Sequence, residues 1–193
     1  MPISDCEVRD PRIRRTRQLL QGALKTLMET KSFDEISVQD IAEAATVNRA
    51  TFYDHYTDKF ALLEAMVAGG FHHLLHERNV TFDGTCPSAV GAIVLAACDY
   101  LTLTHTGGDC ERQSAFAPLI DAAMVGTVQR ILRQGMPSVS GSALTTEVVA
   151  AAASWAICGA VKQWFSDPKR PPAEEIISPL LELILPMLEK SRP

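Results

Sequence analysis

The sequence lacks an uncharged apolar run of the length that a membrane-spanning helix needs. The uncharged stretch rich in apolar residues at 148–161, for example, has fourteen residues, whereas a membrane-spanning helix needs about 20. The N-terminal residues include Asp5, Glu7 and Asp10 and have no apolar core like that of a secretory signal. We therefore expect no membrane partner, no secretion and a cytoplasmic location.

Cysteine is scarce, and its spacing does not suggest metal or disulfide chemistry. The five cysteines are an odd number and contain no C-x-x-C pair, which argues against a zinc knuckle and against a disulfide framework. We expect reduced thiols that are mostly buried. Redox sensing is the less favoured alternative, because it requires an exposed thiol of low pKa.

The sequence also lacks the common motifs of enzymes. It contains no G-x-S-x-G, no H-E-x-x-H and no glycine-rich phosphate loop, so we expect no enzymatic activity. His72, His73 and His76 have spacings that can place two imidazoles on one helical face. No spaced Asp, Glu or Cys partner accompanies them, and we interpret them as surface or pocket-lining histidines. We expect neither a metal nor a cofactor.

Positive charge is in the minority, but it is clustered. The net charge is -5, yet four arginines occur within residues 12–17 and no carboxylate occurs between residues 11 and 28. DNA binding depends on a small basic face rather than on the net charge. These arginines can therefore reach backbone phosphates, and the alternative is an ordinary solvated start of a helix.

The apolar periodicity predicts an all-α protein of about nine helices. Asp10 followed by Pro11 is a typical helix start, with a capping side chain and a proline in the first turn. The predicted helices cover about 11–30, 38–45, 48–55, 58–78, 88–104, 110–119, 120–134, 145–165 and 173–190, with Pro118 as a kink or break.

The stretch 37–59, SVQDIAEAATVNRATFYDHYTDK, predicts two short helices joined by a turn. Ser37 and Asp40 have the S-x-x-D spacing of a capping box, which marks a helix start. Asn48 can cap a second helix in which Phe52 faces inward. Two helices joined by three or four residues form a helix-turn-helix.

The outer face of the second short helix carries side chains suited to reading nucleic acid. Arg49 can bind the major-groove edge of guanine, and Thr51 can contact a base or a phosphate. Tyr53 and His55 can reach phosphate oxygens. Lys59 stands at the start of the next helix, and a lysine beside a helix N-terminus is expected to hold a phosphate.

Two C-terminal helices are too apolar to be hidden in one small core. We expect the helices over 145–165 and 173–190 to pair with the same helices of a second chain in a four-helix interface. The alternative is an ordinary core within one chain. The predicted interface residues are Ala152, Trp155, Ala156, Gly159, Ala160, Gln163, Leu180, Leu183, Ile184 and Met187.

The first 65 residues or so resemble the TetR/AcrR family of bacterial transcriptional regulators. The resemblance rests on I-A-E-A-A-x-V-x-R-x-T-F-Y-x-x-Y-x-x-K-x-x-L-L over residues 41–63. The sequence departs from the family at Thr46 and Ser32, where glycine is common. A β-branched residue is unfavourable at positive φ, so the sequence leaves the geometry of the turn at Thr46 open.

The resemblance implies a ligand-responsive regulator, which we expect to be a repressor, that binds a palindromic operator in double-stranded DNA as a homodimer. It implies an N-terminal arm and helix-turn-helix domain over 1–57, followed by a connecting helix and a larger effector-binding and dimerisation domain over 58–193. The alternative is a helical ligand-binding or protein-interaction module that does not bind an operator.

Two sets of contact residues follow from these expectations. The set for DNA is Arg14, Arg15, Arg17, Ser37, Val38, Asn48, Arg49, Ala50, Thr51, Tyr53, His55, Tyr56 and Lys59. A small-molecule effector of hydrophobic or aromatic character is expected to contact His72, Leu75, Cys98, Leu101, His105, Phe116, Met124, Trp155 and Cys158. Plain core packing is the alternative for each residue of the second set.

Overall fold

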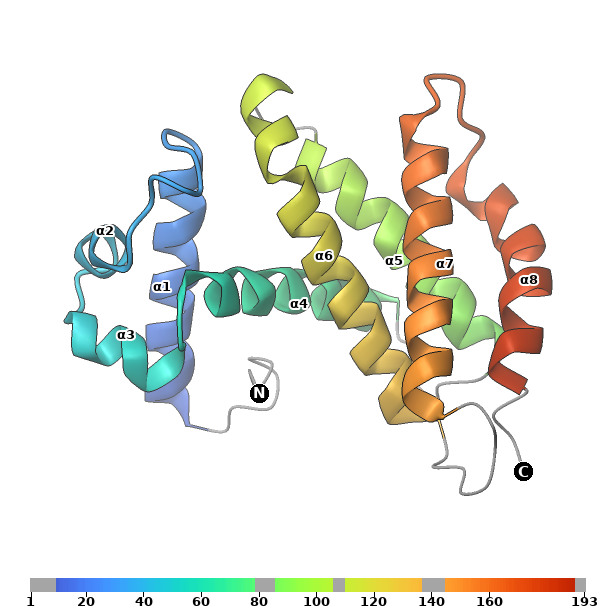
Figure 1. The fold of residues 1–193 in the computed structure, drawn as a ribbon, viewed down its shortest axis with the longest axis horizontal. Coiled ribbons are helices and arrows are strands. Elements are labelled where there is room, and N and C mark those ends of the chain that lie inside the picture. Colours follow the sequence, from blue (N-terminus) through green and yellow to red (C-terminus); the bar gives the residue numbers. More distant parts are fainter. Residues whose placement is uncertain (1–9, 79–85, 106–109, 137–144, 190–193) are drawn as a thin grey trace. The chain divides into compact units, whose positions relative to one another are not determined.

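The protein is described by a computed structural model that covers residues 10–78, 86–105, 110–136 and 145–189. Over these residues the regular structure consists of eight α-helices and one 3-10 helix, η2, without strands (Figure 1). The all-α prediction is therefore confirmed. By its contacts the chain divides into two compact units, which lie within Met1–Gly70 with Gly108–Ala123 and within Phe71–Gly107 with Met124–Pro193. The functional boundary at residues 57 and 58 stays a prediction.

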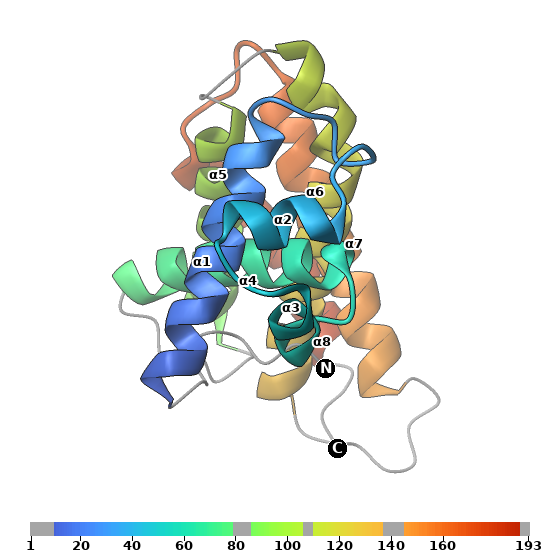
Figure 2. The same cartoon turned by 90° about the vertical axis from the view of Figure 1, so that its left-hand side faces the viewer.

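The first unit contains α1 (Pro11–Met28), α2 (Val38–Ala44), α3 (Arg49–His55) and the start of α4 (Lys59–Glu77). Figure 2 shows α2 and α3 lying against α1. The apolar spacing of the sequence produces this packing, because the buried side chains come from every element of the unit. They include Leu20, Leu24, Phe33, Ile36, Ile41, Phe52 and Leu62.

Local capping chemistry sets the starts of these helices. The Asp10 side chain accepts a hydrogen bond from the Arg12 amide, and Asn48 accepts one from the Ala50 amide at 3.0 Å. Such caps satisfy amides that have no partner within the helix. The helix starts predicted at Asp10, Ser37 and Asn48 are therefore confirmed.

The turn between α2 and α3 has the hydrogen bonds of a Schellman motif. The Val47 amide donates to the Ala42 carbonyl at 2.9 Å, and the Thr46 amide donates to the Glu43 carbonyl at 3.0 Å. This motif requires a left-handed residue after the helix cap, a position usually occupied by glycine. Thr46 occupies it with φ 55°, so the glycine-type turn geometry is kept with a β-branched residue.

The second unit is built around α5 (Pro87–His105), α7 (Thr146–Ser166) and α8 (Ile177–Glu189), which pack against one another. The 3-10 helix η2 (Ala173–Ile176) precedes α8. Thr145 caps α7 by accepting a hydrogen bond from the Val148 amide. The buried faces of the three helices consist mainly of Ala, Val, Ile and Leu, which allows the helices to approach closely.

The helix α6 (Cys110–Gly135) is longer than the sequence predicted. Pro118 lies inside it, and the helix continues past it. The prediction of two helices meeting near Leu119 is therefore wrong. A proline removes one hydrogen bond and disfavours the helical conformation of the preceding residue, yet the helix continues through it.

Two helices are long and apolar enough to cross a membrane when judged by length and composition alone. They are 87–104 of α5 and 146–166 of α7. The structure buries 61% of the first of these segments but only 39% of the second. Core burial is thus sufficient to explain the composition of α5, whereas α7 leaves much apolar surface uncovered.

Candidate nucleic-acid interface

The helix α3 separates an inward apolar side from an outward polar side. Phe52 is fully buried and meets the Tyr53 ring edge-on, whereas Asn48, Arg49, Ala50 and Tyr53 are exposed. This division follows from the helical period, because Phe52 points into the core while the residues at other angles around the axis point away. The expected outward face of the second short helix is therefore present.

Arg49 and Tyr53 form a pair on the exposed face of α3. The Nη2 atom of Arg49 donates to the Tyr53 hydroxyl at 3.1 Å, and the guanidinium carbon lies 5.5 Å from the centroid of the Tyr53 ring. The i, i+4 spacing brings the two side chains together one turn apart. A guanidinium held in this way keeps most of its donors available to a planar acceptor such as a guanine edge.

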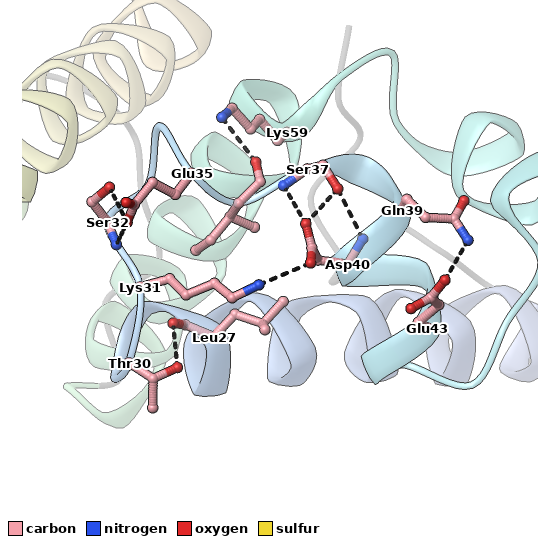
Figure 3. A network of polar contacts seen from close by, with 11 residues as sticks. Leu27, Thr30, Lys31, Ser32, Glu35, Ser37, Gln39, Asp40, Glu43 and Lys59 are labelled. Atoms are coloured by element: carbon pink, nitrogen blue, oxygen red, sulfur yellow. Dashed lines mark hydrogen bonds and ion pairs between the residues drawn. The ribbon is translucent and has the colours of Figure 1, made fainter.

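A reciprocal capping box begins α2 (Figure 3). The Asp40 amide donates to Ser37 Oγ at 3.1 Å, and the Ser37 amide donates to Asp40 Oδ2 at 2.8 Å. Lys31 Nζ donates to Asp40 Oδ1 at 2.9 Å. Hydrogen bonds from Ser37, and then from Lys31, hold the pKa of the Asp40 carboxyl well below its ordinary value.

Lys59, the first residue of α4, directs its ammonium group into the protein rather than outward. Its Nζ donates to the backbone carbonyls of Phe33 at 2.7 Å, Asp34 at 3.2 Å and Ile36 at 2.9 Å. An ammonium has three donors, so these contacts use all of them. The arrangement of this ammonium group does not support the prediction that Lys59 holds a phosphate.

Two other predicted DNA contacts lie in the interior of the first unit. Arg17 is only 7% exposed and Tyr56 only 3% exposed. The Arg17 guanidinium lies 5.4 Å from the centroid of the Tyr56 ring, and Gln21 donates to the Tyr56 hydroxyl at 3.3 Å. Both residues stabilise the packing of α1 against the end of α3, so their assignment to an open DNA face is wrong.

Sequence reasoning missed Gln21 and Lys31 as members of these polar clusters. Gln21 lies one helical turn after Arg17, and this i, i+4 spacing was the available signal. Lys31 lies nine residues from Asp40 in a loop, a separation that no helical periodicity connects.

The other predicted DNA contacts remain open to the surface to different degrees. Arg14, Arg15 and Ser37 are exposed, whereas Val38, Thr51 and His55 are half-buried. The arginines at the start of α1 thus differ from Arg17, because the helical period turns only the last of them toward the core. Contact of these residues with DNA stays a prediction.

The outer faces of α7 and α8 carry large apolar side chains in the second unit. Trp155 is 64% exposed and Leu183 is 69% exposed. Ala152, Gly159 and Gln163 are also exposed on α7, and Ala156, Ala160 and Met187 are half-buried. Leu180 and Ile184 are buried within their own chain, so their predicted place on a free interface face is wrong.

Most of the predicted effector residues belong to a packed core. Leu75, Cys98, Leu101, Met124 and Cys158 are buried, and His72 is half-buried. Trp155 projects outward from α7, so its predicted place in an interior pocket is wrong. The side chains of His105 and Phe116 lie outside the described residues, and the effector contacts of the set stay predictions.

An open groove of about 410 Å³ lies within the second unit, between the start of α5 and α8. Gly91, Leu95, Ile177 and Leu181 supply its apolar walls, and Arg78 lies at its edge. None of the predicted effector residues lines it. Arg78 forms an ion pair with Asp99, so its charge is balanced within the unit.

The thiols and imidazoles of the second unit show no arrangement for chemistry in the described part of the chain. Burial, and then the charge of Asp99, raises the pKa of the Cys98 thiol to about 12. His73 Nε2 lies 3.4 Å from Glu77 Oε1 on the surface of α4. Among the described residues, no three His, Cys, Asp or Glu side chains gather around one position suitable for a metal ion.

Comparison with known proteins finds a family match within the first unit. Residues 19–66 match the family model for bacterial regulatory proteins of the tetR family. The chain is 44% identical over 102 residues to the uncharacterized HTH-type transcriptional regulator YxbF of Bacillus subtilis, covering 50% of this chain and 27% of that protein. It is 30% identical over 64 residues to the dhaKLM operon transcriptional activator DhaS of Lactococcus lactis, covering 33% of this chain and 34% of that protein. The matches thus span about a third or less of these relatives.

A solved structure is similar over more of the chain. It is the TetR transcriptional regulator from Streptococcus agalactiae, which is 22% identical, with 93% of this chain and 98% of that chain covered and a TM-score of 0.45.

Proposed function

We propose that this chain, whose residues 19–66 match the family model for bacterial regulatory proteins of the tetR family, is a cytoplasmic, sequence-specific regulator of transcription that acts as a homodimer. The observation that carries the proposal is the exposed Arg49–Tyr53 pair on the second helix of a fully capped helix-turn-helix. The pair presents guanidinium donors away from the core, as readout of a base edge in the major groove requires.

Homodimerisation is supported by the uncovered apolar face of the second unit. We define the α7/α8 face as Ala152, Trp155, Gly159 and Leu183. It combines two large apolar side chains with small residues that let a partner helix approach. A single helix-turn-helix reads only a few base pairs, and a twofold dimer can read a palindrome with two half-sites. The proposed dimer and the proposed operator symmetry therefore support each other.

Release by a small hydrophobic effector is the finer part of the proposal. The second unit is mainly apolar inside, which suits a ligand with little charge. A coupling free energy of about 1 to 3 kcal/mol between effector and DNA would change operator affinity by about 5- to 150-fold. We favour repression. One relative is named an activator, so in vitro transcription from the bound promoter is the assay that distinguishes repression from activation.

The DNA-binding proposal is tested by selecting binding sites from random duplexes with the wild-type chain, followed by footprinting. We expect a twofold-symmetric site. Arg49→Ala should reduce affinity for it by about tenfold or more and relax the preference at one base pair in each half-site, since a bidentate arginine–guanine contact contributes about 1–3 kcal/mol.

Lys25→Ala is the matched control, because it removes one positive charge from an exposed position on α1. It should leave the base preference unchanged. Equal preference by Arg49→Ala and wild type would contradict the proposed reading helix. Selection of no sequence by the wild type would favour a ligand-binding or protein-interaction module.

A further inference from the structure

Lys59 connects the first turn of α4 with the loop that leads into α2. Its three hydrogen bonds end on carbonyls of residues 33, 34 and 36, which lie 23 to 26 positions earlier in the sequence. Ile36 immediately precedes Ser37, the cap of α2. The contact thus joins two helices at their starts, as the close view of the network shows (Figure 3).

Aromatic packing further fixes the position of the ammonium group. Lys59 Nζ lies 4.7 Å from the centroid of the Phe33 ring and 5.8 Å from that of Phe60. The two rings meet edge-on at 5.2 Å, and Phe33 is buried. A cation beside the faces of aromatic rings gains attraction in addition to its hydrogen bonds. Transfer of this ammonium to a phosphate would break three charge-assisted contacts.

Hydrogen bonds within the loop also shape it. The Ile36 amide donates to the Phe33 carbonyl at 3.2 Å, and Ser32 contacts Glu35. Lys59 and the ring contact of Phe33 with Phe60 reach from this loop to α4, whereas the capping box and Lys31 connect the loop with α2. Since α2 packs against α3, a shift of the loop relative to α4 would displace α2 and, with it, α3, the proposed reading helix.

We propose that Lys59 is a positioning residue that fixes the α1–α2 loop, and through it α2 and α3, to the first turn of α4, and that it is not a phosphate contact. The inference about DNA rests on the proposed function. The inference about the loop does not, because it depends only on contacts within the first unit.

The loop contact is tested by amide hydrogen exchange on Lys59→Met, which keeps the length of the side chain and removes its donors. The exchange of the Ile36 amide should accelerate by about tenfold or more, since hydrogen bonds to a charged group contribute about 1.5–3 kcal/mol. Core amides of α1 should change less. Lys25→Met removes the same charge elsewhere and should leave the Ile36 amide unchanged. Equal acceleration throughout the unit, or none at Ile36, would overturn the proposal.

A measurement on the wild type tests whether the Lys59 ammonium group is held by the loop, even if Lys59→Met fails to fold. The ammonium group of Lys59 should exchange its protons slowly enough to give a resolved ¹⁵N signal, whereas that of the exposed Lys25 should not. The signal should persist unchanged when a nonspecific duplex is added. Loss of the distinction from Lys25, or a shift on addition of the duplex, would refute the assignment.

The salt dependence of nonspecific DNA binding separates positioning from phosphate contact. Loss of one phosphate contact lowers the slope of log K against log salt concentration by about 0.9. Lys59→Met should keep the wild-type slope while weakening selected-site binding, and Arg14→Ala should lower the slope. A lower slope for Lys59→Met would disprove the inference. If the wild type binds no DNA, the proposed function fails, and the exchange and ammonium measurements still decide the loop contact.

Discussion

The amide of Val47 donates a 2.9 Å hydrogen bond to the carbonyl of Ala42 and closes the turn that sets the angle between α2 and α3. Thr46 lies inside this turn with φ 55°. A residue with a Cβ is disfavoured there by roughly 1–2 kcal/mol, and branching at Cβ adds crowding. The turn is therefore held by its hydrogen bonds and by the packing of the two helices, against the preference of its central residue.

Replacement of this residue should stabilise the protein. Thr46→Gly is expected to raise the free energy of unfolding by about 1 kcal/mol, because relief of the left-handed strain exceeds the entropy that glycine adds to the unfolded chain. Calorimetry of wild type, Thr46→Gly and a control variant would measure this change in the free energy of unfolding. Ala45→Gly is the control at the neighbouring residue, which is right-handed, and it should destabilise the protein. A lower stability of Thr46→Gly would contradict the strain.

The Asp40 capping box predicts a dependence of stability on acid pH. The hydrogen bonds from Ser37 and Lys31 lower the pKa of Asp40 in the folded state below its ordinary value of 3.8. The contribution of the ionised carboxylate is therefore complete above about pH 4 and is lost as the pH falls further. Wild-type stability, measured by urea unfolding at several pH values, should decrease over this range.

In Asp40→Asn the decrease below pH 4 should be smaller, because the side chain no longer binds a proton. Asp54→Asn is the control, since Asp54 lies on α3 outside this network, and it should retain the wild-type acid dependence. An identical pH profile for Asp40→Asn and wild type would show that the capping box contributes nothing to the acid sensitivity.

If two chains associate through the α7/α8 face, its exposed apolar residue Leu183 should contribute to the association. Leu183→Glu should shift a dimer toward monomer by at least tenfold in dissociation constant, since a charge buried at the centre of an apolar interface is costly. Sedimentation velocity over a range of concentrations would measure the shift.

Leu103→Glu is the matched control, because Leu103 is 63% exposed on α5 and does not belong to the α7/α8 face. It should leave the association unchanged. A wild type that is monomeric at micromolar concentration, or equal effects of the two variants, would contradict this interface.

The pKa of the Cys98 thiol predicts low reactivity. Since burial raises this pKa to about 12, Cys98 should react with iodoacetamide at pH 8 at least about a hundredfold more slowly than a cysteine of ordinary pKa. Mass spectrometry of the folded protein should find label at the half-buried Cys86 before it appears at Cys98. Urea unfolding should make the two equally reactive. Rapid labelling of Cys98 in the folded protein would instead indicate an accessible thiol.

The amino-acid sequence determined the features that depend on neighbours within about one helical turn. The caps at Asp10, Ser37 and Asn48 and the inward direction of Phe52 could be predicted, because a side chain reaches the next few amides or follows the helical period whatever surrounds it. The same local rules misplaced the end of a helix at Pro118, where the sequence signals a break but the flanking turns continue.

Only the tertiary structure decided where the cationic and aromatic side chains of the first unit point. Arg17 and Arg14 look alike in the sequence, yet one packs on Tyr56 from 39 positions later and the other is exposed. Lys59 meets carbonyls of the earlier loop, and Leu183 and Ile184 differ in exposure through the packing of α8. Such contacts join residues that no local periodicity relates, so they follow from the packing of whole helices and not from the pattern around each residue.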